Sequence, residues 1–415
     1  MSSFAYSTDR SSADANRRQP TDKFARDLVH QRLSGLRGGN LVIDDPSGTT
    51  QFGSAPDLRA HLRVRHNRFY RSVLLGGALA AGETFVQGDW ECDDLTSLLR
   101  MFARDASSTR RMNRGFAALL SVINRLLHWR RANTRSGSRR NIAAHYDLGN
   151  DFYQLWLDET LAYSSGIFLS KSATLHEASV EKFDRVCRLL NIKQGDDVIE
   201  IGGGWGGFAI HAAANYGCRV TTTTISPKQY ELARERIRNA GLSDRVTLLQ
   251  SDYRELEGQY DKLVSIEMIE AVGYRFLDRF FQRCSLLLKP HGSMMLQAIV
   301  MPERGYDRYL QTPDFINRYV FPGGCLPSLG AILASIARAT DLRFVQADDH
   351  AADYAETLRR WRSSFTESLA EVRGLGHSEE FIRLWTYYLC YCEAAFEERC
   401  IGLLQILFDK PASRR

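Results

Sequence analysis

The stretch VIEIGGGWGGFAI, residues 198–210, places Gly202, Gly204 and Gly207 between an apolar run with strand character and a run with helix character. Glycine at such a junction lets the backbone turn sharply and lets a ligand approach without a Cβ in the way. The pattern predicts a strand, a ligand-binding loop and a helix in succession.

The segments around this stretch repeat the alternation of strand and helix. Strands are predicted at 197–201, 219–224, 246–250, 262–266 and 293–300, and helices at 208–216 and 227–240. From Tyr354 onward the pattern is helical and rich in aromatic residues. Strands separated by helices of about 10–15 residues imply an α/β fold with a doubly wound, mostly parallel, Rossmann-like sheet, here with a helical C-terminal cover.

The glycine pattern by itself fits either a dinucleotide or S-adenosylmethionine. A nicotinamide site needs an acidic residue about 20 residues farther on, at the end of the second strand, and the corresponding stretch TTTTISP has none. Glu200 instead lies two residues before the first glycine, and Asp252 follows the third predicted strand, where its carboxylate can accept a hydrogen bond from an adenine amine. These features favour the fold and cofactor of an S-adenosylmethionine-dependent methyltransferase.

Composition divides the 415 residues into four parts. Residues 1–20 are predicted to be a disordered tail, and 21–108 a small mixed N-terminal domain with turn signals at 44–48 and 76–77 and a helix at 95–104. Residues 109–140 form a basic amphipathic linker, and 141–415 the methyltransferase domain.

Several classes of protein are disfavoured by what the sequence lacks. No apolar run approaches the ~20 residues of a membrane span, and the polar N-terminus lacks the apolar core of a signal peptide, so a cytoplasmic location is expected. The eight cysteines form no CxxC pair, which argues against a zinc site or a disulfide framework. We expect free thiols and no bound metal.

The linker concentrates positive charge. Between positions 110 and 140 the chain carries nine arginines and no acidic residue, and residues 115–131 have apolar positions at helical spacing. The segment can be a linker helix packed on its own protein, a contact with an anionic lipid surface, or a nucleic-acid contact. Nothing else in the sequence favours nucleic acid, so we expect no such partner.

Four further stretches extend the pattern to most of the chain: AHYDLGNDFYQLWLDETLAYSSGIF (144–168), SIEMIEAVG (265–273), INRYVFPGGCLPS (316–328) and a C-terminal run that begins at YAETLRRWRSSF (354–365). With the glycine loop, these resemble the cyclopropane-fatty-acyl-phospholipid synthases and the related mycolic acid methyltransferases over roughly residues 25–410. The resemblance implies a C-methyltransferase that acts on the double bond of an unsaturated acyl chain in a membrane phospholipid. It also implies peripheral association with the inner face of the membrane, a lipid-associated N-terminal domain and a homodimer.

The resemblance also implies roles for individual residues. The cofactor contacts that it implies are Tyr163, Ser164, Gly202, Gly204, Thr224, Gln229, Asp252, Tyr253 and Ile266. Glu200 is added to these predicted cofactor residues on the residue pattern described above. In the family a bound bicarbonate ion serves as the base. The matching residues here are Glu270, Tyr319 and Ile299, the last through its backbone. Two positions depart, because Ser165 replaces a cysteine and Gln297 a histidine; both can still hydrogen-bond an anion.

Glu267 lies three residues before Glu270, and if this stretch is helical the two carboxylates share a face. Glu267 can be a solvated or salt-bridged side chain without chemical importance, or it can supply the carboxylate that bicarbonate supplies in relatives. Because the base decides the fate of a carbocation, the product stays open between a cyclopropane and a methyl-branched or methylated unsaturated chain, including a precursor of furan fatty acids. Two other classes are weaker: a methyltransferase for small polar acceptors, and a non-catalytic binding protein.

Overall fold

The structure is a computed structural model, and it describes residues 20–105, 148–312 and 314–414. All of the basic linker (109–140) and all of the predicted tail except Pro20 lie outside the described residues. The described residues form two compact units. One contains the N-terminal elements and Val372–Glu398, and the other contains the glycine loop and the large sheet.

The N-terminal unit is built on a four-stranded sheet in the order β2-β1-β3-β4, in which only β1 and β3 are parallel. Its strands and helices are β1 (Asn40–Asp45), β2 (Gly48–Phe52), β3 (Arg59–Val64), β4 (Trp90–Cys92), α1 (Pro20–Leu33), α2 (Arg68–Val86), α3 (Leu95–Arg104) and α17 (Glu379–Glu397). The pair 76–77, predicted to be a turn between elements, lies inside α2. It kinks the helix where Gly77 has a φ of 61°, a value that favours glycine.

Helix α17 is a correction to the predicted domain boundary, which placed all of 141–415 in one domain. It packs against α3 and α2, where Thr96 Oγ1 donates to Glu393 Oε2 over 3.3 Å. Arg100 Nε donates to Glu398 Oε1 over 2.7 Å. The contact partners of this helix therefore lie almost 300 positions earlier in the chain. Local sequence patterns do not reveal contacts between residues so far apart.

The second unit is built on a seven-stranded sheet in the order β10-β11-β9-β8-β5-β6-β7. Its strands are β5 (Asp197–Ile201), β6 (Arg219–Thr223), β7 (Val246–Leu249), β8 (Tyr260–Ile266), β9 (Leu288–Val300), β10 (Arg343–Asp349) and β11 (Gly402–Asp409). The five strands from β9 to β7 are mutually parallel, and β11 is antiparallel to both β9 and β10. The predicted mostly parallel Rossmann-like sheet is confirmed, whereas β10 and β11 were not predicted.

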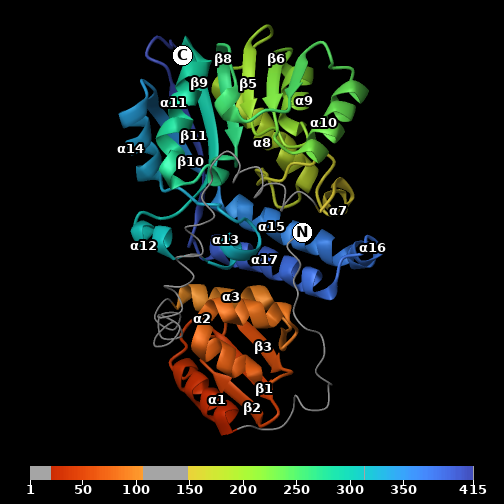
Figure 1. Cartoon of the computed structure of the whole chain (residues 1–415), viewed down its shortest axis with the longest axis vertical. Coiled ribbons are helices and arrows are strands. Elements are labelled where there is room, and N and C mark those ends of the chain that lie inside the picture. Colours follow the sequence, from red (N-terminus) through yellow and green to blue (C-terminus); the bar gives the residue numbers. More distant parts are fainter. Residues whose placement is uncertain (1–19, 106–147, 313, 415) are drawn as a thin grey trace. The chain divides into compact units, whose positions relative to one another are not determined.

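Helices cover both faces of this sheet (Figure 1). One face is covered by α11 (Leu277–Leu287) and α14 (Leu329–Ala339), and the other by α8 (Leu175–Leu190), α9 (Gly207–Tyr216) and α10 (Pro227–Asn239). The remaining helices are α7 (Asn150–Gln154), α12 (Tyr306–Gln311), α13 (Phe315–Tyr319), α15 (Ala351–Glu367) and α16 (Leu369–Gly374). Neighbouring residues of one strand alternate between the two faces: Ile199 packs with α11 and α14, and Val198 packs with α8 and α9. Burial on both faces explains why these strands read as continuous apolar runs.

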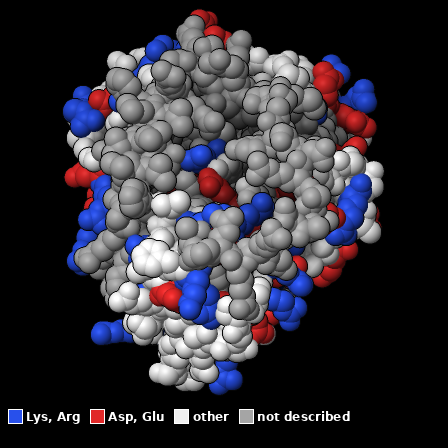
Figure 2. Space-filling view, turned by 60° about the horizontal axis from the view of Figure 1, so that its bottom comes forward, with Lys and Arg blue, Asp and Glu red and all other residues white. Residues whose placement is uncertain are grey.

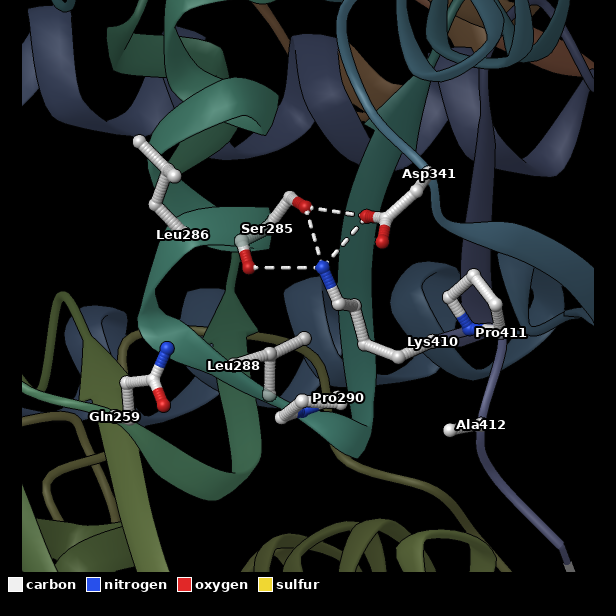
Figure 3. Close-up of a pocket in the computed structure, with 9 residues that line it drawn as sticks. All are labelled: Gln259, Ser285, Leu286, Leu288, Pro290, Asp341, Lys410, Pro411 and Ala412. Atoms are coloured by element: carbon white, nitrogen blue, oxygen red, sulfur yellow. Dashed lines mark hydrogen bonds and ion pairs between the residues drawn. The ribbon is translucent and has the colours of Figure 1, made fainter.

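A small pocket lies where β9 and β10 begin, at the opposite edge of the sheet from the glycine loop (Figure 3). Lys410 Nζ crosses it to reach Asp341 Oδ1 at 2.6 Å and Ser285 Oγ at 3.0 Å. Ligands of such sheets bind outside the carboxyl ends of the strands, so this pocket lies away from the expected cofactor position.

Charges of both signs lie next to one another on the described part of the face in Figure 2. Within the described ranges, no helix is both long and apolar enough to cross a bilayer.

Two adjacent leucines on α11 test the packing of this unit. Leu287 is 1% exposed and lies in the core beside β9, whereas Leu286 is 60% exposed. We expect Leu287→Ala to lower the free energy of unfolding by about 2–5 kcal/mol, because a buried leucine leaves a cavity. Leu286→Ala should stay within about 0.5 kcal/mol of the wild type. Urea unfolding followed by circular dichroism measures both, and equal effects would contradict the assigned packing.

Candidate active site

The glycine loop follows β5 directly and has an unusual backbone. Gly202, Gly204 and Gly206 have φ values of 91°, 54° and 83°, which side chains with a Cβ rarely adopt. Gly203, which the sequence pattern did not single out, is required for a different reason. A Cβ there would lie 1.9 Å from Thr222 Oγ1 and 2.8 Å from Glu200 Oε2. A Cβ added at Gly204 would meet no atom within 4 Å. Open space therefore lies beside the loop at this glycine, and a cofactor can fill it.

Glu200 lies beneath this loop. Its side chain is 3% exposed, and its carboxylate accepts a hydrogen bond of 2.6 Å from Thr222 Oγ1. Burial raises the pKa of Glu200 to about 7, against the opposing effects of Thr222 and the charge of Lys182. The structure thus gives Glu200 a partner on the neighbouring strand, where it supports the loop.

The other expected cofactor residues follow the carboxyl ends of β6, β7 and β8. Thr224 Oγ1 donates to Gln229 Oε1 over 2.7 Å. Asp252 Oδ1 accepts from the backbone and from Nε of Arg254, at 3.0 and 2.8 Å. Tyr253 packs its ring edge-on against Phe280, and Ile266 ends β8. This edge of a parallel sheet is where nucleotide-like ligands bind.

The segment that carries Tyr163 and Ser164 packs into an aromatic cluster. The Tyr163 ring lies 5.5 Å from Trp156 and 5.4 Å from Trp361, measured between ring centroids. Trp156 and Trp361 are almost fully buried. Ser164 accepts a hydrogen bond of 2.6 Å from Nζ of Lys182, a buried lysine of α8 that the sequence analysis did not identify. These packed rings therefore largely exclude water from this side of the site, and aromatic rings favour a nearby positive charge.

Glu267 is the most densely hydrogen-bonded carboxylate at this edge. Its Oε1 accepts from the backbone N–H of Ser165 at 2.9 Å and from Nε2 of Gln297 at 2.8 Å. Its Oε2 accepts from the hydroxyl of Tyr354 at 2.6 Å. These three donors show that the Glu267 side chain is bound within the protein and is not freely solvated.

The backbone at Glu267 also differs from the expectation. Glu267 has a φ of 49° directly after β8, and the short 3-10 turn begins only at Ile269. The two carboxylates therefore do not share a helical face. The left-handed residue turns the chain at the strand end, and its backbone N–H still donates to Gln297 O over 2.8 Å.

Glu270 has a poorer set of partners. Its Oε1 accepts from the backbone N–H of Ile299 over 2.6 Å, and its Oε2 is buried without a hydrogen-bond partner. Burial and the charge of Glu267 raise the pKa of Glu270 to about 8. Two neighbouring carboxylates cannot both ionise cheaply. Burial raises the pKa of Glu267 as well, but its three donors favour the ionised form. Glu270, with fewer partners, is the carboxyl of the pair that holds its proton more tightly.

Not every expected residue is found in these contacts. Tyr319 lies at the end of α13, with the guanidinium of Arg318 over its ring. The phenol that donates to Glu267 belongs to Tyr354 on α15, which the sequence analysis missed although it begins the quoted run YAETL. Thr357, one turn later on the same helix, accepts from the backbone N–H of Gly166 over 3.1 Å. The helical period of the run YAETL could have indicated this, because residues three apart, such as Tyr354 and Thr357, lie on the same side of a helix.

Within the described residues there is no group of His, Cys, Asp and Glu side chains that could hold a metal ion. All eight cysteines are free thiols.

Comparisons with known proteins agree with this geometry. The profile of the mycolic acid cyclopropane synthetase family matches residues 133–406. The tuberculostearic acid methyltransferase UfaA1 of Mycobacterium tuberculosis is 37% identical over 87% of this chain and 83% of its own length. The cyclopropane-fatty-acyl-phospholipid synthase of Escherichia coli is 37% identical over 86% of this chain and 89% of its own length.

Solved structures give the same result. The mycolic acid cyclopropane synthase CmaA1, solved with SAH and CTAB, superimposes with a TM-score of 0.62 at 28% identity, covering 66% of this chain and 98% of its own. The cofactor is S-adenosylmethionine, and the glycine loop, with its positive φ values and open outer side, fits it. This chain belongs to the mycolic acid cyclopropane synthetase family of S-adenosylmethionine-dependent methyltransferases.

Proposed function

We propose that this enzyme adds a methylene group to the double bond of an unsaturated fatty acyl chain of a membrane phospholipid and so forms a cyclopropane. Its relatives methylate or cyclopropanate unsaturated fatty acyl chains. The observation that carries the proposal is Glu267, a carboxylate held by three hydrogen-bond donors at the cofactor edge of the sheet.

The reaction needs no base before the methyl group moves, because an alkene has no acidic proton to lose. S-adenosylmethionine supplies an electrophilic methyl group. The alkene π electrons form the new C–C bond as the S–C bond breaks, which leaves a cation on the other alkene carbon. A base then removes one proton from the new methyl group, and that C–H pair of electrons closes the three-membered ring. The residues here must exclude water, tolerate a cation and accept one proton.

Glu267 is the base in this proposal. Ser165, Gln297 and Tyr354 fix its carboxylate and stabilise its ionised form. Glu270 stays protonated near neutral pH and adds no second charge. The carboxylate then serves in place of the bicarbonate implied by the family resemblance, and the same three donors are not available to a separate anion while Glu267 occupies them.

A methylated unsaturated or methylene chain is the second candidate, favoured by the similarity to the tuberculostearic acid methyltransferase. The same cation gives these products when a different proton leaves or a hydride shifts first. Ring, methylene and methylated alkene all add one CH2 to the substrate. A saturated methyl branch needs two further hydrogens from a reductant in a later step.

Replacement of Glu267 tests the base. We expect Glu267→Gln to lower kcat by at least about a hundredfold, the typical contribution of a positioned general base. Wild-type turnover should be unchanged when bicarbonate is removed by degassing and bicarbonate-free buffer. Methyl transfer from labelled S-adenosylmethionine to vesicles of an unsaturated phospholipid measures both.

The matched control is Glu257→Gln, the same change at an exposed position of this unit, and it should keep full activity. Wild-type activity that needs added bicarbonate, or a Glu267→Gln variant that keeps its turnover, would overturn the role of Glu267.

The product is tested by mass spectrometry of lipids from a host that expresses the chain. We expect unsaturated acyl chains to gain one CH2 and the fragments to locate a ring at the former double bond. Resistance of the product to mild hydrogenation separates the ring from an isomeric alkene. A product that takes up hydrogen would instead establish the second candidate.

The basic segment is the proposed contact with an anionic membrane surface. Its nine arginines without a compensating acid favour anionic lipid heads, and a homodimer would bring two such segments to one bilayer.

We expect the combined change of Arg125, Arg130 and Arg131 to Glu to lower both binding and activity on anionic vesicles. Activity on lipid dispersed in neutral detergent should be kept, and the matching Arg→Lys variant should resemble the wild type. Co-sedimentation measures binding. Unchanged binding of the Glu variant would remove this contact.

A further inference from the structure

Lys182 is the one fully buried lysine among the described residues, with no exposed surface. A buried ammonium is costly unless anions and hydrogen-bond acceptors surround it. Its Nζ donates to Ser164 Oγ at 2.6 Å and lies 3.5 Å from Ser164 O. The proposed function assigns no role to Lys182.

The helix that carries Lys182 is fixed independently of the site. Helix α8 begins with a capping box: Thr174 Oγ1 accepts from the N–H of Glu177, and the Glu177 carboxylate accepts from the N–H of Thr174. Its buried side packs Phe183 and Val186 into the core against β5 and α9. The ammonium is therefore delivered to the site by a rigid element.

Three acidic side chains act on the Lys182 ammonium, each from a different part of the chain: Asp158, which precedes Tyr163 and Ser164 by a few residues, Glu200 on β5, and Glu267 after β8. Asp158 already accepts from Ser179 Oγ and Thr160 N. Glu200 accepts from Thr222. The charges that face Glu267 are Lys182 and Glu270, and the phenol of Tyr354 is its remaining titratable neighbour.

The hydrogen-bond donors of Glu267 are all neutral: a backbone N–H, an amide and a phenol. Gln297 stands where relatives are expected to carry a histidine, so that position supplies no cation. A carboxylate buried beside a second carboxylate needs a positive charge nearby to stay ionised. Lys182 lies next to it through two neighbouring residues, because Ser164, which accepts from Lys182 Nζ, directly precedes Ser165, whose N–H donates to Glu267. Lys182 is also a cation whose charge acts on Glu267.

We propose that Lys182 is a positioning residue that holds Ser164 in place and whose buried positive charge keeps Glu267 ionised for proton removal. This role rests on the proposed function of Glu267. The lysine touches neither substrate nor reacting atoms in this assignment, and it acts through two other residues: Ser164 by hydrogen bond and Glu267 by charge.

The sign of the pH dependence follows from the two groups. Burial raises the pKa of Glu267 and the charge of Lys182 lowers it, so loss of the lysine raises that pKa further. The base is active only when deprotonated, so activity falls as the pH drops through this pKa. Burial lowers the pKa of Lys182 itself to about 8. Above that pH the wild type also loses the positive charge and converges on a variant without it.

The test is the pH profile of kcat for Lys182→Met and Lys182→Gln in the full-length chain. Gln keeps a donor for Ser164 without the charge, so it separates the two parts of the role. We expect the ratio of wild-type to variant kcat to be at least about tenfold larger near pH 6.5 than near pH 9, since one pKa unit corresponds to a tenfold change in ionisation. Lys193→Met, the same change at an exposed lysine just beyond α8, should match the wild type at every pH.

The outcomes separate this inference from the proposed function. A constant ratio across the pH range, with Glu267→Gln inactive, would overturn the role of Lys182 alone. A Glu267→Gln variant that turns over would overturn the base itself. If Lys182→Met does not fold, the same change in the Glu267→Gln background decides: recovery of thermal stability there supports the charge pairing, and unfolding in both backgrounds overturns it.

Discussion

A carboxylate taken out of bulk water must find hydrogen-bond donors, and Glu267 finds three from three separate parts of the chain: Ser165, Gln297 on β9 and Tyr354 on α15. Each donor fixes a different wall of the site. The segment that carries Tyr163 to Ser165, strand β9 and helix α15 are thereby held at one point. A left-handed backbone at Glu267 makes this possible, because it ends β8 and turns the side chain back towards the sheet edge. Backbone strain of this kind persists where surrounding contacts compensate for it.

The sheet supplies the rigidity that this arrangement needs. Five parallel strands buried on both faces bring their carboxyl ends to one edge of the sheet. Strand β11 lies between β9 and β10 and is hydrogen-bonded to both. Gln405 of β11 donates to Gln297 Oε1 over 2.9 Å, which orients the Gln297 amide so that its nitrogen faces Glu267. A strand that forms only near the end of the chain thus sets the direction of a donor in the active site. The glutamine pair is buried, so its orientation is fixed by these bonds.

The proposed cationic reaction needs a site that excludes water and in which few charges are free to react. Glu200 and Glu267 both act on the charge of Lys182, and Glu267 acts on Glu270; burial raises the pKa of each of the three carboxyls. Their partners differ: a threonine for Glu200, three donors for Glu267, and one backbone N–H for Glu270. Similar side chains in unlike environments take unlike protonation states, which is how one site holds both an acid and a base. The aromatic cluster around Tyr163 supplies a surface that tolerates positive charge without taking the proton.

The sequence alone determined the α/β class, the strand-turn-helix around Gly202 and Gly204, and the cofactor, because these depend on local periodicity and on backbone freedom at glycine. It also identified Glu267, Glu270, Ser165 and Gln297 as candidate residues of the base site. Only the tertiary structure decided which carboxylate is well hydrogen-bonded, that Tyr354 is the phenol in contact with it, and that Lys182 lies fully buried beside Ser164. It also joined α17 to the N-terminal unit and added β10 and β11 to the sheet. Each of these depends on contacts between residues far apart in the chain, and neither the spacing nor the type of a residue records which distant partner burial will give it.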